Sequence, residues 1–345
     1  MNNKVVGDQI RKLIELSGGN LEHEDLISEM ISTVLRLSTD HSARGDVKII
    51  HQALKEIRYG FKLFSPYQNR KKISIFGSAR SNPAEPIYGQ AAEFSRKIAT
   101  KGFMVITGAG EGIMRAAQDG AGPGNSFGVN IMLPFEQGAN EFIENDPKLM
   151  TFKYFFARKL FFVKEANAIA LFPGGFGTHD EAFEALTLLQ TGKTDPLPLV
   201  LIDVPGGGYW ESWRLYLENA FLSRELISEE DMDLFKVTDD IGAAVDEIVS
   251  FYHNYHSIRF VRDRMVVRLN HPVQREMLDH LNDHFSGICL EGKITSTEAL
   301  REEMDEPDLV GMPRIVFCFN RKSFGRLRKM IDVINTFPVK ERVAS

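Results

Sequence analysis

The sequence of 345 residues lacks cysteine pairs, an excess of basic residues and long apolar runs. Cys289 and Cys318 are its two cysteines, and they form neither a metal-ligand spacing nor a disulfide framework, which indicates a reducing compartment. The formal net charge of -6 at pH 7 gives no broad basic surface for nucleic acid. No segment approaches the roughly 20 apolar residues that cross a bilayer, and no signal peptide is recognisable. We therefore expect a cytoplasmic protein that binds neither nucleic acid nor membrane.

Short apolar runs that end in glycine turns occupy the middle of the chain. Residues 1–66, by contrast, are charged and carry apolar residues three or four positions apart, which predicts helices. From Lys72 onward we predict five strands, in "KISIFGSAR", "FMVITGAGEG", "SFGVNIMLP", "AIALFPGGFG" and "LPLVLIDVP", and a further short strand at the start of "LFKVTDD". The stretches between them are long enough for crossover helices, which is typical of a parallel sheet covered on both faces. The fold class is therefore α/β, with a doubly wound sheet.

The pattern changes again after His256. A strand, helix, strand, strand, helix order predicts a small α+β unit there. We thus expect three parts: a helical extension at 1–66, an α/β domain at 67–256 and a small α+β domain at 257–345. Every glycine turn lies before residue 257, so we expect the last part to modulate the protein without supplying catalytic groups.

Glycine follows three of the predicted strands. In an open parallel sheet, ligands bind beyond the carboxyl ends of the strands. Bare backbone at these turns, with a helix starting at once, favours a phosphate as the ligand. Alternatively, any one of these glycines only packs a helix against its strand. The dinucleotide fingerprint G-x-G-x-x-G is absent, because Ile113 stands at its last glycine. The glycines are Gly77, Gly108, Gly110, Gly112, Gly174, Gly175 and Gly177.

The stretch "PGGFGTHDE", residues 173–181, is the most specific signal. It follows a predicted strand and leads into a helical pattern. Thr178 and Glu181 have the spacing of a capping box, which predicts Thr178 as the helix N-cap and gives Glu181 a purely structural role. A cap alone, however, does not require the three preceding glycines. An acid beside an anion site is also costly unless it has another function, so we favour a functional role for Glu181.

A second signal is the aromatic-rich helix "FKYFFARKLFFVKEANA", which carries Arg158 and Lys159. Both long side chains could extend past their apolar neighbours to water. Alternatively, if the helix borders the crevice, the guanidinium of Arg158 is suited to a phosphate or to a polar edge of the ligand. The aromatic residues exceed what one face of a sheet covers, so we expect a homo-oligomer, at least a dimer.

Together, "PGGFGTHDE", the Arg-Lys pair and "GAGEGIMRAA" make residues 70–255 resemble the LOG family, the cytokinin-activating phosphoribohydrolases and related bacterial nucleotide nucleosidases. The resemblance implies a Rossmann-like sheet, an oligomer, and hydrolysis of a nucleoside 5'-monophosphate such as AMP to free base and ribose 5-phosphate. It makes Glu181 and Arg158 catalytic. It also implies these substrate-binding residues: Ser78, Gly108, Gly110, Lys159, Gly174, Gly175, Gly177 and Thr178.

The implied reaction accounts for the motif chemically. Cleavage of an N-glycosidic bond builds positive charge on the ribose, which an ionised Glu181 can stabilise while it orients the attacking water. Glycine amides that hold the phosphate fix the sugar at the other end. We expect no metal and no cofactor. The name lysine decarboxylase has been attached to similar sequences, but the sequence shows no pyridoxal-phosphate site.

Two departures from the family pattern are visible. Ala109 stands where G-G-G is common, and His179-Asp180 replaces an apolar residue followed by an acid. Two alternative functions stay open. A non-catalytic nucleotide-binding or carrier protein would use the same crevice, and a transferase would form product only with an acceptor other than water.

Overall fold

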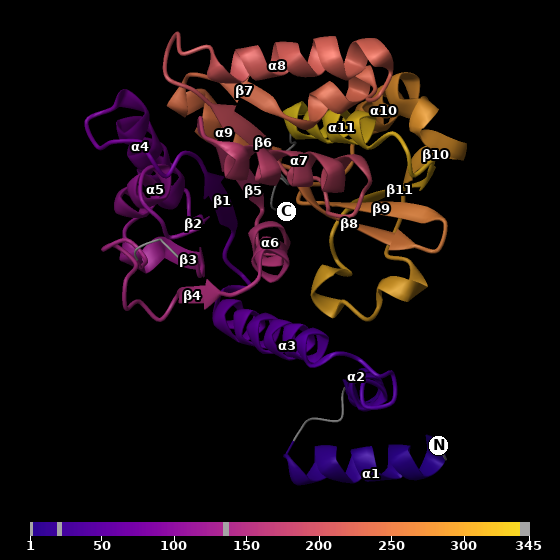
Figure 1. Ribbon diagram of the computed structural model, residues 1–345. Helices are drawn as coiled ribbons and strands as arrows, with labels where there is room; N and C mark the ends of the chain where they lie inside the picture. The colour runs from indigo at the N-terminus through magenta and orange to yellow at the C-terminus, as the bar shows by residue number, and fades with distance from the viewer. Residues whose placement is uncertain (1–2, 19–22, 134–137, 339–345) are drawn as a thin grey trace. The chain divides into compact units, whose positions relative to one another are not determined.

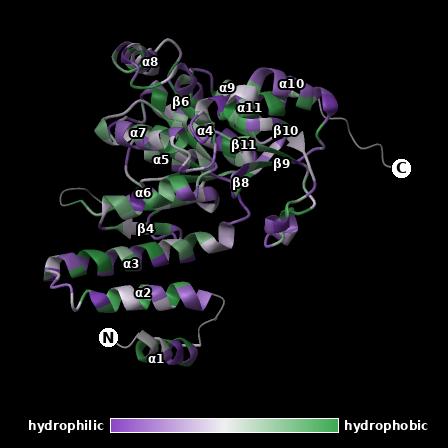
Figure 2. Ribbon diagram, turned by 90° about the vertical axis from the view of Figure 1, so that its right-hand side faces the viewer, coloured by the Kyte–Doolittle hydropathy of each residue, from purple (hydrophilic) through white to green (hydrophobic). Residues whose placement is uncertain are grey.

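The computed structural model describes residues 3–18, 23–133 and 138–338. The chain divides into two compact units, residues 1–61 and 62–345. The first unit contains α1 (Asn3–Leu16), α2 (Glu24–Arg36) and most of α3 (Arg44–Phe64). Hydrophobic and hydrophilic residues are interspersed along α2 and α3 (Figure 2), as is expected of helices with apolar residues three or four positions apart. None of the helices in the described ranges has the length and apolar character needed to cross a membrane.

The second unit contains a seven-stranded sheet in which all paired strands are parallel, in the order β4-β3-β2-β1-β5-β6-β7 (Figure 1). This confirms the predicted α/β fold class. The strand that the sequence did not reveal is β4, because four residues next to an aromatic run are too short to show a period of two. The strands are β1 (Lys72–Phe76), β2 (Met104–Thr107), β3 (Ser126–Ile131), β4 (Leu149–Phe152), β5 (Ala168–Leu171), β6 (Leu199–Ile202) and β7 (Lys236–Thr238).

Helices cover both faces of this sheet. On one face, α4, α5 and α9 pack against buried strand residues such as Ile73, Ile75 and Val105. On the other face α6 is anchored by Phe161 and Phe162, and the Phe162 ring lies 4.7 Å from that of Phe76. The helices are α4 (Pro86–Thr100), α5 (Ile113–Ala121), α6 (Phe155–Lys164), α7 (Phe176–Gln190), α8 (Tyr209–Ala220) and α9 (Ile241–Phe251).

The strand order reverses between β1 and β5. From β1 the chain proceeds through β2 and β3 to β4 at one edge, and β5 then returns to pair with β1 on its other side. Such a reversal opens a crevice at the carboxyl ends of the two strands. The turns that follow them are joined directly, since the Ser78 N–H donates to the Pro173 carbonyl at 3.0 Å. The topology therefore brings two of the predicted glycine turns together.

A four-stranded antiparallel sheet of order β10-β11-β9-β8 follows. The strand, helix, strand, strand, helix order expected after His256 is present, preceded by β8. Arg328 pairs with Glu247 at 2.6 Å. This ion pair connects α11, which packs on the antiparallel sheet, to α9, which packs on the parallel sheet. The division into three domains stays a prediction. The elements are β8 (Tyr255–Val261), β9 (Arg264–Leu269), α10 (Arg275–Phe285), β10 (Cys289–Ser296), β11 (Arg314–Phe319) and α11 (Phe324–Thr336).

Candidate active site

A cavity of about 810 Å³ lies at the carboxyl ends of β1, β2 and β5. It is lined by every residue that the sequence singled out for catalysis or substrate binding except Lys159. The residues brought together are Ser78, Gly108, Gly110, Arg158, Gly174, Gly175, Gly177, Thr178 and Glu181.

The glycines around this cavity differ in what they do. A Cβ at Gly77 would lie 2.7 Å from the Ile113 side chain, so this glycine packs a helix against its strand. A Cβ at Gly174 would lie 2.1 Å from Thr178 Oγ1, which also excludes a side chain. At Gly175 and Gly177, in contrast, a Cβ would meet nothing within 4 Å. Packing does not explain these two, and both line the cavity, which favours close approach of a ligand.

The first turn of α7 corrects the predicted cap. The helix begins at Phe176, and Gly175 is its N-cap residue, so Thr178 lies inside the helix. The Thr178 and His179 N–H groups donate to the Gly175 carbonyl at 3.1 and 3.2 Å. The helix therefore starts two residues before Thr178, the residue whose side chain was predicted to cap it. The predicted Thr178–Glu181 capping box is therefore wrong. No side chain of the described residues caps this helix start, so its first amides, those of Phe176 and Gly177, are available to an anion.

Glu181 lies one turn further along α7, with only 7% of its surface exposed. Lys159 Nζ is 3.1 Å from Glu181 Oε2. Burial raises the pKa of Glu181, while the charges of Lys159 and Arg158 act against this shift. A carboxylate that is shielded from water and balanced by two cations is suited to stabilise positive charge in a ligand.

Arg158 reaches the same cavity from α6. Its guanidinium lies over two aromatic rings, 4.8 Å from the centre of Phe155 and 5.5 Å from that of Phe162. It also lies beside the second glycine turn, because a Cβ at Gly108 would be 3.9 Å from Arg158 Nη1. The aromatic neighbours thus hold the guanidinium at the cavity, where it offers several donors to a phosphate.

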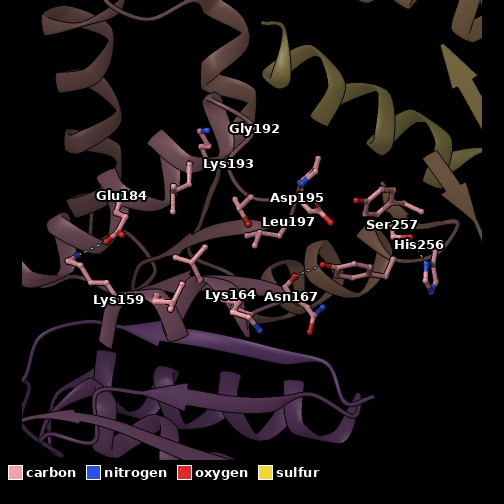
Figure 3. A pocket seen from close by; sticks show the side chains of 18 of the residues that line it. Lys159, Lys164, Asn167, Glu184, Gly192, Lys193, Asp195, Leu197, His256 and Ser257 are labelled. Atoms are coloured by element: carbon pink, nitrogen blue, oxygen red, sulfur yellow. Dashed lines mark hydrogen bonds and ion pairs between the residues drawn. The ribbon is translucent and has the colours of Figure 1, made fainter. Parts of the chain in front are cut away.

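Lys159 is the predicted site residue that the structure places elsewhere. Its ammonium lies 3.0 Å from Asp180, 3.1 Å from Glu181 and 2.7 Å from Glu184. Burial works against the charged form, but these three carboxylates raise the pKa of Lys159. The residue lines a second cavity, where Figure 3 shows it bonded to Glu184. Lys159 therefore pairs with the candidate catalytic carboxylate of Glu181 but lines the second cavity and not the first.

Two residues that the sequence did not single out hold the glycine turn of residues 173–177. The Tyr209 hydroxyl donates to the Gly174 carbonyl at 2.5 Å, and His179 Nε2 is 2.7 Å from the same hydroxyl. Because the single hydroxyl proton points to Gly174, Nε2 must donate to Tyr209. Burial lowers the pKa of His179, which favours this neutral ring. The departure at His179 was the only signal in the sequence, and nothing in it identified Tyr209 as the partner.

Asn140 fixes the second glycine turn. Its Nδ2 donates to the carbonyls of Ala109 and Gly110 at 3.1 and 2.8 Å. Ala109 has a φ of 61°, in the left-handed region that favours glycine, so the alanine at this position is accommodated by surrounding hydrogen bonds. Hydrogen bonds from the Ala109 N–H to Thr107 and from Asn140 to the Ala109 and Gly110 carbonyls thus hold this turn with alanine at position 109.

Metal-binding geometry lies away from this cavity. Among the residues that the structure describes, Asp263, Glu291 and Cys318 form a group whose potential ligand atoms lie within 4.8 Å of one another. The group belongs to the four-stranded sheet and its connections, and none of its members lines the first cavity.

The chain was compared with known proteins. Residues 111–248 match a family model described as "Possible lysine decarboxylase". A cytokinin riboside 5'-monophosphate phosphoribohydrolase of Mycobacterium tuberculosis is 27% identical over 175 residues, which cover 50% of this chain and 90% of that protein.

Two solved structures match about half of the chain at low similarity. A molybdenum cofactor carrier protein of Chlamydomonas reinhardtii is 21% identical with a TM-score of 0.36, over 52% of this chain and 99% of that one. DNA processing protein A of Helicobacter pylori is 16% identical with a TM-score of 0.38, over 56% and 85%.

The segment that matches the family model contains Gly112 at the end of the second glycine turn, as well as Arg158, Gly174 and Glu181. It supplies most of the residues that line the cavity, and the family motif is complete within it, while the lining residues Phe76 to Arg80, Gly108 and Gly110 precede it. The match of residues 111–248 and the similarity to the mycobacterial phosphoribohydrolase support the resemblance of this part of the chain to the LOG family.

Proposed function

We propose that the protein hydrolyses the N-glycosidic bond of a nucleoside 5'-monophosphate, releasing the free base and ribose 5-phosphate. The observation that carries this proposal is the pairing, in one cavity, of an open helix start with the buried carboxylate of Glu181. The family and its mycobacterial member, which is named as a phosphoribohydrolase, support the reaction type.

In the proposed complex the phosphate lies at the start of α7. The amides of the first helical turn, next to the bare backbone of Gly175 and Gly177, supply donors to its oxygens. Arg158 adds a charge-assisted contact from α6. Holding the phosphate at one end lets its binding energy position the ribose against the acid at the other end.

Glu181 acts at the sugar. As the bond to the base breaks, positive charge develops at C1' and the ring oxygen, and an ionised carboxylate stabilises it. The same group can orient or deprotonate the water that adds to C1'. The role of Lys159 is indirect in this scheme, because its ammonium pairs with Glu181 and favours the ionised form that the reaction needs.

A panel of substrates tests the proposal. We expect at least one of AMP, CMP, GMP and UMP to yield free base, while the matching nucleosides without phosphate react far more slowly, because the α7 contacts are lost. Chromatography of the reaction mixtures measures both. Tight binding of a monophosphate without any release of base would instead identify a carrier protein, and release only with an added acceptor would identify a transferase.

Replacement of Lys159 by methionine should move the acidic limb of the rate–pH profile to higher pH. Removing a cation that favours the carboxylate raises the pKa of Glu181 further, so the ionised form is lost earlier as the pH falls. The profile of initial rate against pH measures this. The matched control is Asp180→Asn, which removes an exposed partner of Lys159 and should leave the limb in place. Overlapping profiles for Lys159→Met and the unmodified chain would contradict the assignment.

Tyr209→Phe should weaken substrate binding more than it slows the reaction. The variant loses the hydrogen bond to the Gly174 carbonyl, which positions the phosphate turn, but leaves Glu181 and Arg158 in place. We expect KM to rise by about fivefold, corresponding to a hydrogen bond of about 1 kcal/mol, with kcat within about twofold. Steady-state kinetics separate the two. A fall in kcat at constant KM would show that Tyr209 acts on the transition state instead.

We also propose that the chain forms a homo-oligomer, a dimer or larger. Three large apolar side chains of α6 remain exposed in the single chain: Phe155 at 49%, Phe156 at 55% and Leu160 at 38%. Light scattering should report at least twice the chain mass of 39.0 kDa at micromolar concentration. A mass of one chain under those conditions would refute the proposal.

A further inference from the structure

The N-terminal helices α2 and α3 each carry a stripe of apolar side chains. Within each stripe the residues follow one another after three, four and again three positions. This spacing places them on one side of a helix, and it is the pattern by which one helix packs against another. The α2 stripe is Ile27, Met30, Val34 and Leu37, of which Leu37 directly follows the last helical residue. The α3 stripe is Val47, Ile50, Leu54 and Ile57.

No residue of either stripe is buried in the described part of the chain. Helix α2 has no buried residue at all, and Met30 is 52% exposed. In the α3 stripe Val47, Ile50 and Leu54 are exposed, Leu54 at 50%. Residues 37–43 connect the two helices, yet neither helix covers the stripe of the other. Because exposed apolar surface of this extent is unfavourable in water, we expect a partner molecule to cover it.

The two helices carry opposite net charge. Helix α2 contains three acids, Glu24, Asp25 and Glu29, and one base, Arg36, which gives a net charge of -2. Helix α3 contains five lysines and arginines and two acids, which gives a net charge of +3. Two α3 helices in contact would bring like charges together, whereas α2 against α3 brings opposite charges together. Charge therefore favours an α2 helix as the partner of α3.

We propose that the chain pairs with a second copy of itself through these helices, with the α2 stripe of each copy on the α3 stripe of the other. A two-fold arrangement makes this contact twice, so one partner molecule covers all four stripes and matches the charges in both contacts. The surface consists of other residues than the exposed side chains of α6, and it does not depend on the proposed reaction.

A lipid surface fits these helices less well. An anionic membrane attracts a basic amphipathic helix such as α3. It repels the acidic α2, however, whose stripe would then stay in water. A second copy of the chain covers both stripes and is the partner that the charges favour.

Cross-linking of the full chain with a short bis-maleimide tests the pairing. Val34→Cys and Leu54→Cys lie in the middle of the two stripes, so the double variant places thiols on both sides of each contact. We expect it to give a product of twice the chain mass of 39.0 kDa. Each single variant should give no more product than the unmodified chain, in which Cys289 and Cys318 set the background.

Three results of this experiment would overturn the proposal. A cross-link found only within one chain would show that α2 covers α3 of the same molecule. An efficient product of twice the chain mass from Leu54→Cys alone would identify a contact between two α3 helices instead. The third is a double variant that gives no product above the background.

Replacing a residue of the α3 stripe by lysine makes the test specific. Ile50→Lys, added to the double cysteine variant, should lower the yield of the interchain product by about tenfold or more, because an ammonium would have to enter the apolar contact. The matched control is Tyr59→Lys. Tyr59 is about as exposed as Ile50, at 43% against 42%, but it follows about two and a half turns later and lies on the opposite side of α3.

Both lysine substitutions lie at exposed positions, so neither removes a buried contact of the single chain. We expect the Tyr59→Lys yield to equal that of the double cysteine variant. Equal losses, or no loss, in the Ile50→Lys and Tyr59→Lys proteins would contradict the assigned surface. Co-sedimentation of the unmodified chain with phosphatidylserine vesicles, together with no interchain product, would identify a lipid surface as the partner and overturn the proposal.

Discussion

Glu181→Gln lowers the turnover of a nucleoside monophosphate by about 10²-fold or more, or roughly 3 kcal/mol, and leaves the melting temperature nearly unchanged. The amide keeps the volume of the side chain but has no charge to oppose the developing cation and cannot take a proton from water. Helix α7 begins with Gly175 as its cap, so the variant does not lose a capping interaction. Lys159 keeps Asp180 and Glu184 as partners.

The comparison needs turnover and melting temperature from the same preparation. Glu111→Gln is the matched control, because Glu111 is exposed in the second glycine turn and pairs only weakly, at 3.8 Å, with Arg115. We expect it to retain the normal rate. A Glu181→Gln protein that retains a near-native rate would show that the Glu181 carboxylate does not take part in catalysis.

Arg158→Ala should lower kcat/KM by about 10²-fold, the second largest effect expected. The guanidinium is held over Phe155 and Phe162 and lies at the cavity beside Gly108, so its removal takes a positioned cation from the site. If Arg158 holds the phosphate in the ground state, the loss appears in KM. If it acts mainly in the transition state, kcat falls instead.

Arg158→Lys and Arg115→Ala make the Arg158 measurement specific. Lysine keeps the charge but not the planar fork, so we expect only partial rescue. Arg115 is a partly exposed arginine of α5 whose partners are Glu111 and Glu141, and its removal should not affect kinetics. Unchanged kcat and KM in Arg158→Ala would show that the Arg158 side chain extends past its aromatic neighbours to water and does not contact the substrate.

The sequence predicted the sheet well, because parallel strands buried on both faces appear as continuous apolar runs, each ended by glycine. It missed β4 (Leu149–Phe152), whose four residues show no distinct pattern. The reversal between β1 and β5 was not readable either. Strand order depends on which strands pair across the sheet, and β1 pairs with β5 over a separation of almost 100 residues.

The local motif predicted which residues gather at the cavity, since Gly174 to Glu181 form one turn and the start of one helix. Sequence spacing failed where side chains from different elements meet. Lys159 was predicted to bind the substrate, as Arg158 was predicted to act on it, but the two residues line different cavities because successive helical residues diverge by about 100°. Tyr209 reaches Gly174 from α8, three elements later in the chain, which no local pattern encodes.

The most direct test of the central claim is a time course of products from a single nucleoside monophosphate incubated with the full chain alone in buffer. Chromatography follows the free base, and a colorimetric assay for reducing sugar follows ribose 5-phosphate. The account predicts that both appear at the same rate and in equal amounts, and that neither appears with Glu181→Gln. Recovery of the nucleotide intact from saturated, folded protein would contradict it.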